Sequence, residues 1–499
     1  MKAGRHEISK KRVGGAAAAW LLVPLLVLVV LKTGYLPQVT RSYPSSAKLK
    51  AADGLPKTTD SVAEAPPSPT STDEIAGDGV DAIKDLKHGS DILAMNGEID
   101  GSLRNSDVAS PISKLSCNFS YARMNICNME GDVRMHGKSA AVYVVGASDD
   151  TYRPEKGPVT IRPCPRKWEM HTMRMIREVT IRSSARGTAP PQCTVTHDVP
   201  AVVFSTGAFS SNLFHAMNDI VLPLYITARE YDGHVQLVAT DYDLEFISKY
   251  RHIFDALSVY PVIDFDADYE VHCFPSAQVG IESHQDLGIN PALSRNGYTI
   301  MDFQSFLRSA YSLKRAWATP ASRSSGQRPR LVMILRHHSR ALTNEAEAVA
   351  VATEVGFEVV AAGLEVVRDL AQFAEVVNSC DVVMGVHGAG LTNLVFLPHN
   401  GTLMQIIPWG DLKWSCWNAF GRPLPEMGLR YVEYEVTAEE TTLKDVYPRD
   451  HAVFTHPRSL HTEDFDNVWK IFLDGQNVTL DIHHFRGVMQ KVYQSITIT

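Results

Sequence analysis

Short apolar runs alternate with segments of helical periodicity through the second half of the chain. The runs have the length of strands buried on both faces, and the segments between them place apolar residues on one side of a helix. The expected strands are Leu331–Leu335, Phe357–Val360, Asp381–Val386 and Thr402–Ile407, and the expected helices are Asn344–Val355 and Val367–Ser379. Strands that alternate with helices indicate parallel sheets built from βαβ units.

The first half of the chain shows the same alternation less cleanly. The expected strands are Ala140–Val145, Pro158–Ile161, Ala201–Phe204, Val235–Ala239 and Val259–Ile263, with helices at Asn212–Tyr231 and Leu244–Phe254. The polar stretch Pro320–Arg330 suits an interdomain linker. We therefore predict an α/β protein with two Rossmann-like domains, at 115–325 and 326–480, followed by a C-terminal segment at 481–499. The domains are expected to face a cleft, because ligands of open α/β sheets bind beyond the carboxyl ends of the strands.

The chain before residue 110 has a different character. Val13–Leu31 is uncharged and long enough to cross a bilayer as a helix. Basic residues outnumber Glu7 in residues 1–12, which predicts a cytosolic tail, a transmembrane signal anchor and a lumenal body. A cleaved signal peptide is the alternative, but the apolar run ends in lysine rather than in small residues. Residues 32–110 are rich in Ser, Pro, Thr, Asp, Gly and Ala, and are expected to form a flexible stem.

Charge and glycosylation signals fit this arrangement. The net charge is -8, with no dense basic block outside the N-terminal tail, which argues against nucleic acid as a partner. Asn118, Asn400 and Asn477 each begin an Asn-X-Ser/Thr sequon, as expected of a lumenal glycoprotein. Asn400 also suits a simple turn.

The chain has seven cysteines, and some should pair in an oxidising lumen. Proximity along the chain suggests the disulfides Cys117–Cys127 and Cys164–Cys193. The odd number leaves at least one free thiol. No Cys/His group has the spacing of a zinc site, so no structural metal is expected.

A glycine turn follows the expected strand Asp381–Val386. It contains His387, Gly388 and Gly390, with donors on Thr392 and Asn393. Glycines let backbone N–H groups approach an anion closely, and a helix N-terminus adds partial positive charge. The turn therefore indicates an anion-binding cradle, and the alternative is a tight strand-to-helix turn without a ligand.

A basic loop follows the strand Leu331–Leu335. Arg336 and Arg340 lie at the same carboxyl edge as the glycine turn, where guanidiniums would suit a diphosphate. The alternative is a solvated loop whose arginines pair with Glu345 or Glu347.

A third group opens the helix Asn212–Tyr231. His215 and Asp219 are four residues apart and share one helix face, an arrangement that can remove a proton from an alcohol. The alternative is a pair that satisfies a buried helix end. Asp264–Asp268 resembles a divalent-metal motif of sugar-nucleotide enzymes, but a turn is the better interpretation. Trp409, Trp414 and Trp417 could stack on sugars or simply pack.

Four segments together resemble glycosyltransferase family 61, and its plant xylan arabinosyl- and xylosyltransferases in particular. They are Asn212–Leu222, Arg336–Glu345, Gly385–Asn393 and Gln476–Val478, and the similarity spans roughly 115 to 490. The resemblance implies a GT-B-like fold, inversion at the anomeric carbon and a UDP-activated pentose or N-acetylhexosamine.

By match to the family motifs, Arg336, Arg340 and His387 would hold the donor's nucleotide and phosphates, and Asp219 would be the base. Members usually carry an acidic residue and then an aromatic one after the histidine of the first motif, where this chain has Ala216 and Met217.

These inferences combine into one hypothesis. The chain is expected to be an inverting Golgi transferase, a single-pass type II membrane protein, that moves arabinofuranose or xylose from a UDP-sugar to a cell-wall polysaccharide, most simply xylan. No cofactor is required if guanidiniums stabilise the diphosphate, although participation of a divalent metal is left open. Complexes with other Golgi transferases are compatible with this picture. The alternatives are an N- or O-glycan β-1,2-xylosyl- or N-acetylglucosaminyltransferase, and a non-catalytic glycan-binding Golgi protein of the same fold.

Overall fold

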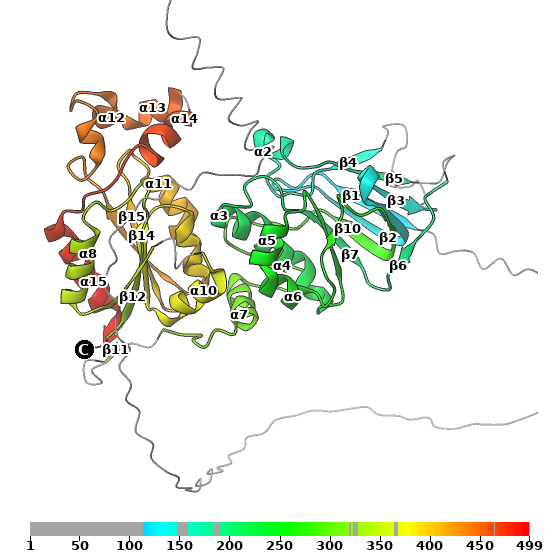
Figure 1. The fold of residues 1–499 in the computed structure, drawn as a ribbon, viewed down its shortest axis with the longest axis horizontal. Coiled ribbons are helices and arrows are strands. Elements are labelled where there is room, and N and C mark those ends of the chain that lie inside the picture. The colour runs from blue at the N-terminus through cyan, green and yellow to red at the C-terminus, as the bar shows by residue number, and fades with distance from the viewer. Residues whose placement is uncertain are drawn as a thin grey trace, which may run out of the picture. The chain divides into compact units, whose positions relative to one another are not determined.

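A computed structural model of the 499-residue chain describes most of the region after residue 112 (Figure 1). The described residues are 113–146, 158–183, 189–318, 321–322, 328–363, 368–463 and 465–498. Within these ranges no helix has the length and apolar character needed to span a bilayer. The expected anchor at 13–31 and stem at 32–110 lie outside the described residues.

The first sheet has ten strands in the order β4-β5-β3-β2-β10-β7-β8-β9, with β1 beside β2 and β6 beside β10. The strands are β1 (Lys114–Asn118), β2 (Ile126–His136), β3 (Ala141–Val145), β4 (Val159–Ile161), β5 (Val179–Ser183), β6 (Val195–Thr196), β7 (Ala201–Ser205), β8 (Gln236–Thr240), β9 (Ile263–Asp264) and β10 (Val271–Val279). The series β10-β7-β8-β9 is parallel. In contrast, β2 pairs antiparallel with β1, β3 and β10.

The prediction of a Rossmann-like first domain is therefore right only for the parallel part of this sheet. Residues 113–146 add antiparallel strands that the alternation did not distinguish. The connection from β2 to β3 is the turn Gly137–Ser139, which is too short for the crossover that parallel neighbours need.

Helices of the first half follow the expected segments with two local changes. The run after Asn212 comprises α3 (Leu213–His215), a π-helical turn (Ala216–Val221), α4 (Leu222–Ala228) and a 3₁₀ turn (Arg229–Tyr231). The expected helix Leu244–Phe254 is divided at Tyr250 into α5 (Leu244–Lys249) and α6 (Arg251–Leu257). The remaining helices of this half are α2 (Met170–Arg174) and α7 (Ile300–Ala310). The capping box of Thr299 and Asp302 starts α7.

The second sheet is parallel throughout and follows the order β13-β12-β14-β15-β16. Its strands are β12 (Arg330–Ile334), β13 (Glu358–Ala362), β14 (Val382–Val386), β15 (Thr402–Ile407) and β16 (Arg430–Glu435). Four of them match the expected strands to within about two residues at each end. Main helices are α8 (Glu345–Val355), α10 (Leu370–Ser379) and α15 (Ile482–Ile496). Short elements of this half include α11 (Lys413–Cys416), α12 (Ala452–Thr455), α13 (Pro457–Glu463), α14 (Phe465–Asn467), β11 (Ala321–Ser322) and β17 (Thr497–Ile498).

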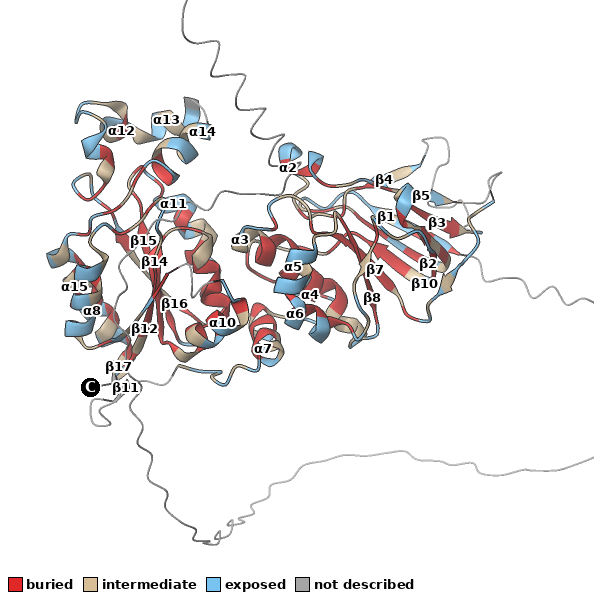
Figure 2. Ribbon diagram, viewed as in Figure 1, coloured by how far each residue is buried: buried red, intermediate tan, exposed pale blue. Residues whose placement is uncertain are grey.

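Hydrophobic packing joins the two halves of residues 113–498. One continuous core contains Val202 and Leu237 of the first sheet together with Val332 and Val383 of the second. The inner strands β14 and β15 of the second sheet are buried along their length, as Figure 2 shows. The segment 481–499 contributes to this half, because Phe485 and neighbouring apolar residues of α15 pack with α8 in a core on the other face.

The disulfide prediction is half confirmed. Cys117 and Cys127 are joined across β1 and β2, but the pairing Cys164–Cys193 is wrong. Cys193 is bonded to Cys273 of β10, 80 residues away, because the segment around β6 lies alongside β10. Proximity along the chain could not reveal that register.

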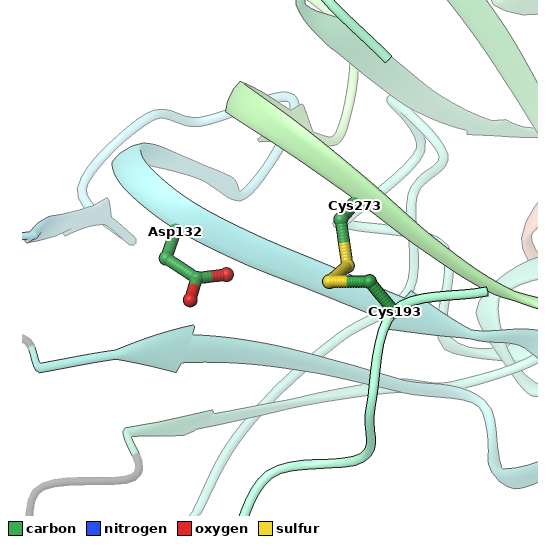
Figure 3. A group of neighbouring side chains, drawn as sticks. All are labelled: Asp132, Cys193 and Cys273. Atoms are coloured by element: carbon green, nitrogen blue, oxygen red, sulfur yellow. A yellow bond between two sulfur atoms is a disulfide. The ribbon is translucent and has the colours of Figure 1, made fainter. Parts of the chain in front are cut away.

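Among the described residues, the one grouping of potential metal ligands is Asp132 with Cys193 and Cys273. Figure 3 shows the two sulfur atoms joined to each other. Asp132 also accepts hydrogen bonds from Arg134. Because metal ligation requires thiolates, this group is not a metal centre.

Candidate functional site

The strand order of the second sheet reverses between β12 and β14, its two adjacent central strands. Such a topological switch point is where open α/β sheets bind ligands. Arg336 follows β12, and His387 follows β14, so the two sequence-predicted segments meet here. A pocket of about 250 Å³ opens at this edge, lined by Leu213, Lys249, Ile334, Leu335, Arg336, His337, His338, Leu370, Gly390 and Asn393. Leu213 and Lys249 come from the first half of the chain, so both halves form the pocket.

Arg336 lies against the glycine turn. Its Nε donates to the carbonyl oxygen of Ser339 at 2.8 Å, which fixes the plane of the guanidinium. A Cβ placed on Gly388 would lie 2.5 Å from Nη1 of Arg336 and 3.6 Å from Nη1 of Arg340. The absence of a side chain at Gly388 is therefore what lets both cations approach the turn.

Arg340 is 7% exposed and holds a left-handed backbone conformation with φ of +54°. Its Nη1 donates to the carbonyl oxygen of His387 at 3.0 Å, while its Nε has no hydrogen-bond partner among the described residues. Burial, reinforced by the charge of Arg336, lowers the pKa of Arg340 to about 10. Burial also lowers the pKa of Arg336.

No described carboxylate forms an ion pair with Arg336 or Arg340. The nearest acidic influence is Asp474, which favours the charged form of both arginines without pairing with either. Two cations that are withdrawn from water without a counter-ion are costly to bury. The arrangement is explained if an anion binds between them, and guanidiniums bind phosphate oxygens in bidentate fashion. The alternative, in which the loop pairs with Glu345 or Glu347, is not what the structure shows.

His387 is held from behind by a short relay of side chains. Tyr431 Oη donates to Oε1 of Gln405 at 2.9 Å, and Nε2 of Gln405 lies 2.7 Å from Nδ1 of His387. With the amide as donor, Nδ1 accepts, and the neutral ring carries its proton on Nε2. Burial, together with the charges of Arg340 and Arg336, lowers the pKa of His387 to about 3. His387 is thus a neutral donor beside two cations.

The remaining residues of the glycine turn either line the pocket or carry buried oxygen atoms without a hydrogen-bond partner among the described residues. Gly390 and Asn393 line the pocket, and Asn393 Nδ2 donates to the carbonyl oxygen of Gly390 at 2.8 Å. Oδ1 of Asn393 and Oγ1 of Thr392 are buried without a partner among the described residues. The segment Ala389–Phe396 that follows is a 3₁₀ helix.

The segment Gln476–Val478 anchors the arginine loop. The Arg340 amide donates to the carbonyl oxygen of Gln476 at 2.6 Å, and the Ala341 amide donates to Oδ1 of Asn477 at 3.0 Å. Val478 continues the pairing with Ala341 through its own amide. The fourth motif of the family resemblance thus holds the Arg340 backbone beside the turn, although it is about 136 residues away in sequence.

A second cluster surrounds Asp219 in the π-helical turn Ala216–Val221, where the carboxylate is 5% exposed. Oδ2 lies 2.7 Å from Nδ1 of His215, and Oδ1 accepts from Nδ2 of Asn218 at 2.7 Å. Arg166 Nη1 donates to both oxygens, at 3.1 and 3.0 Å. Every face of the carboxylate is therefore occupied by a protein donor.

Arg166 is the residue of this cluster that sequence reasoning missed. It lies 53 residues before Asp219 and also binds Glu169, so no spacing signal linked it to the helix. Cys164 lies in the same cluster, where burial and the charge of Asp219 raise its pKa to about 12. The thiol is therefore protonated and chemically quiet.

Aromatic rings connect the two clusters. Phe214 is 5.7 Å from His215 and 5.7 Å from Phe420, and Phe420 is 5.6 Å from His387, measured between ring centroids. The helix α3 also contacts the Ala389–Phe396 turn. Both predicted histidines thus flank one interface between the two halves.

Ala216 and Met217 are both fully buried in the core. Neither side chain lines the pocket. The two residues that differ from the family pattern therefore belong to the hydrophobic core and not to the pocket wall.

The remaining predicted residues occupy surface or structural positions. Asn118 and Asn400 are exposed, and Asn477 is partly buried with its side chain hydrogen-bonded. The run Asp264–Asp268 is confirmed as a turn, because Oδ1 of Asp264 accepts from the amides at 266 and 267. Trp409 donates to the carbonyl oxygen of Val453, whereas Trp414 and Trp417 are exposed.

A family model for glycosyltransferase 61 matches residues 213–404, which include His215, Asp219, both arginines and the glycine turn. An alpha-1,3-arabinosyltransferase of Oryza sativa subsp. japonica is 43% identical over 388 residues. That alignment covers 77% of this chain and 66% of the relative, so the chain spans slightly less than two-thirds of its length.

Two further relatives are covered more fully. A beta-1,2-xylosyltransferase of Oryza sativa subsp. japonica is 39% identical over 79% of this chain and 87% of its own length. A xylan glycosyltransferase of Arabidopsis thaliana is 32% identical over 79% of this chain and 83% of its own length. On this similarity, and with its motifs gathered at one interface, the chain belongs to glycosyltransferase family 61.

Proposed function

We propose that this protein transfers a pentose, arabinofuranose or xylose, from a UDP-sugar to xylan with inversion at the anomeric carbon. The observation that carries the proposal is the pair of withdrawn arginines without an acidic partner, beside a glycine turn at the switch point of a parallel sheet. A diphosphate supplies the charge that this pair lacks. The relatives named as arabinosyl- and xylosyltransferases support a pentose donor and a xylan acceptor.

In the proposed reaction the second half of the chain binds UDP. Negative charge grows on the diphosphate as the glycosidic bond breaks, and Arg336 and Arg340 stabilise it together with the Nε2 proton of His387. Groups fixed in advance act most strongly because they need not reorient during the reaction. Since two cations already carry this charge, the reaction needs no divalent metal, and chelators should leave the rate unchanged.

The acceptor hydroxyl would be deprotonated in the first half of the chain. We assign this role to Nε2 of His215, with Asp219 holding the ring through Nδ1. Both carboxylate oxygens of Asp219 are already engaged by Arg166 and other donors, whereas no described residue bonds Nε2 of His215. This reverses the order expected from the family motif, in which Asp219 itself is the base.

The architecture supports a GT-B-like arrangement, with donor and acceptor groups on opposite sides of the interface between the halves. We further propose a Golgi protein anchored by residues 13–31, with the described body in the lumen. The apolar run, the sequons and the two disulfides support this placement. The N- and O-glycan transferases remain the enzymatic alternative, because relatives named as protein O-linked-mannose beta-1,4-N-acetylglucosaminyltransferases match at 24 to 25% identity.

UDP release from the full-length protein tests the proposal. UDP-arabinofuranose, UDP-xylose and UDP-N-acetylglucosamine are each offered with xylo-oligosaccharides and with O-mannosyl peptide. Release with a UDP-pentose and xylo-oligosaccharide is expected, and Arg336→Ala should abolish it. Full activity in that variant would remove the donor site, and release only with the peptide would favour the alternative. A protein that binds glycan without releasing UDP would be the non-catalytic one.

A further inference from the structure

Phe209 is an exposed aromatic ring beside the candidate base. The side chain is 40% exposed, and its ring centroid lies 5.1 Å from that of His215. It stands on the loop that joins the carboxyl end of β7 to α3, on the side of the sheet edge where open α/β folds place their ligands. Nothing in the first sheet's packing requires an apolar ring at this position, because Phe209 is not part of any hydrophobic core.

The loop that carries Phe209 is fastened rather than loose. Ser205 Oγ donates to Asp241 Oδ2 at 2.7 Å and accepts from the Gly207 amide at 2.9 Å. Thr206 Oγ1 donates to the carbonyl oxygen of Asp241 at 2.6 Å. Ala208 has a φ of +61°, which a residue with a side chain rarely adopts. Strained backbone of this kind persists where surrounding contacts hold it, and it is concentrated at functional sites.

We propose that Phe209 is the acceptor platform, on which the xylose unit to be modified stacks through its C–H face. The inference rests on the proposed function. A pyranose ring has an apolar face of C–H groups and a rim of hydroxyls. A flat, exposed aromatic ring next to an imidazole can bind the C–H face and leave a hydroxyl close to the imidazole. Stacking on Phe209 would hold one hydroxyl beside Nε2 of His215. The hydroxyl would then already be oriented for proton transfer, which lowers the entropy cost of the reaction.

The position of Phe209 favours the acceptor over the donor sugar or the uracil base. Phe209 lies on the His215 side of the aromatic connection, whereas Arg336 and Arg340 lie on the His387 side. Phe209 does not line the pocket beside the arginines. It is therefore an acceptor-positioning residue.

Direct binding to the full-length protein tests this role without relying on turnover. The Kd for a xylo-oligosaccharide and the Kd for UDP are measured by calorimetry for the wild type, Phe209→Ala, Phe209→Leu and Phe209→Tyr. Loss of the ring should weaken oligosaccharide binding by about fivefold to tenfold and leave UDP binding unchanged. Phe209→Leu keeps apolar volume but no flat face, so it should behave like alanine, and Phe209→Tyr should restore affinity.

Tyr269→Ala is the matched control. Tyr269 is 74% exposed, and its ring contact is with Lys138, so its loss should change neither affinity. Unchanged oligosaccharide affinity in both Phe209→Ala and Phe209→Leu would overturn the platform. Weakened UDP binding in the same variants would also overturn it, because the ring would then serve the donor.

The two proposals fail in different ways. A wild-type protein that binds neither UDP nor xylo-oligosaccharide would end the proposed function. A wild-type protein that binds both, with variants at Phe209 that bind the oligosaccharide equally well, would end only the platform. The melting temperature of each variant is measured as well. A melting temperature equal to that of the wild type shows that a loss of binding reflects the missing ring and not a misfolded loop.

Discussion

Gly388→Ala perturbs the candidate donor site by a single methyl group. The new Cβ would lie 2.5 Å from Arg336 Nη1, far inside van der Waals contact. The displaced atom is the end of the Arg336 side chain, so the guanidinium can swing away without moving the sheet, at the cost of its hydrogen bond to Ser339. The backbone cost is also limited, because alanine at a φ of +158° adds about 1–3 kcal/mol of strain.

The magnitude for the ligand follows from what the displaced guanidinium would contribute. A charge-assisted hydrogen bond contributes about 1.5–3 kcal/mol, which corresponds to about a tenfold to 150-fold weaker Kd for UDP. Calorimetric titration of UDP into the full-length variant measures this directly. Thermal unfolding, measured in parallel, should show a decrease of only a few degrees.

Gly487→Ala is the control for glycine replacement itself. Gly487 lies within α15, and a Cβ there meets no atom within 4 Å. Alanine at this position should stabilise the helix slightly and leave the Kd for UDP unchanged. Wild-type UDP affinity in Gly388→Ala would refute the reasoning, because the guanidinium could not then be an anion ligand.

Three further predictions follow from the charges and bonds of the described residues. Because the pKa of His387 falls from 6.5 to about 3 on folding, the unfolded chain binds more protons between these values, so stability is lost as pH falls from about 6.5 towards 3. His387→Gln should flatten that part of the curve of unfolding free energy against pH, and an unchanged slope would contradict the lowered pKa of His387. Cys273→Ser should remove about 4 kcal/mol by releasing an 80-residue loop, seen as a lower melting temperature, on which reductant should then act only through the Cys117–Cys127 disulfide. Asp219→Asn should keep the Kd for UDP but lower turnover by orders of magnitude through misorientation of His215, and normal turnover would assign the base elsewhere.

Prediction from sequence was strongest where one physical signal dominates. Four strands of the second sheet were found because each is a short, mostly apolar run, which is typical of a buried parallel strand, whereas β16 was missed because it mixes charged and aromatic residues. The positions of Arg336 and Gly388 followed, since residues just after parallel strands share one edge of the sheet. The prediction failed where alternating runs near residues 113–146 fit either sheet direction.

Contacts between distant segments were not predictable in the same way. Arg166 reaches Asp219 across 53 residues, and Cys193 reaches Cys273 across 80. Neither pairing leaves a periodic trace, because a single side-chain contact imposes no pattern on its neighbours. The free thiol of Cys164 illustrates the error, since it lies nearer to Cys193 in sequence but packs beside a carboxylate instead.

The sequence alone indicated the candidate site segments and the sheet edge on which the arginine loop and the glycine turn stand, because hydrophobic periodicity and turn composition are local properties. Only the tertiary structure decided which charges remain unpaired. Arg336 and Arg340 are candidate anion ligands because no described carboxylate pairs with them, and Asp219 is bound by Arg166 as well as by His215. Those relations depend on the packing of two halves against each other, and the free energy of a buried charge is set by all its neighbours at once.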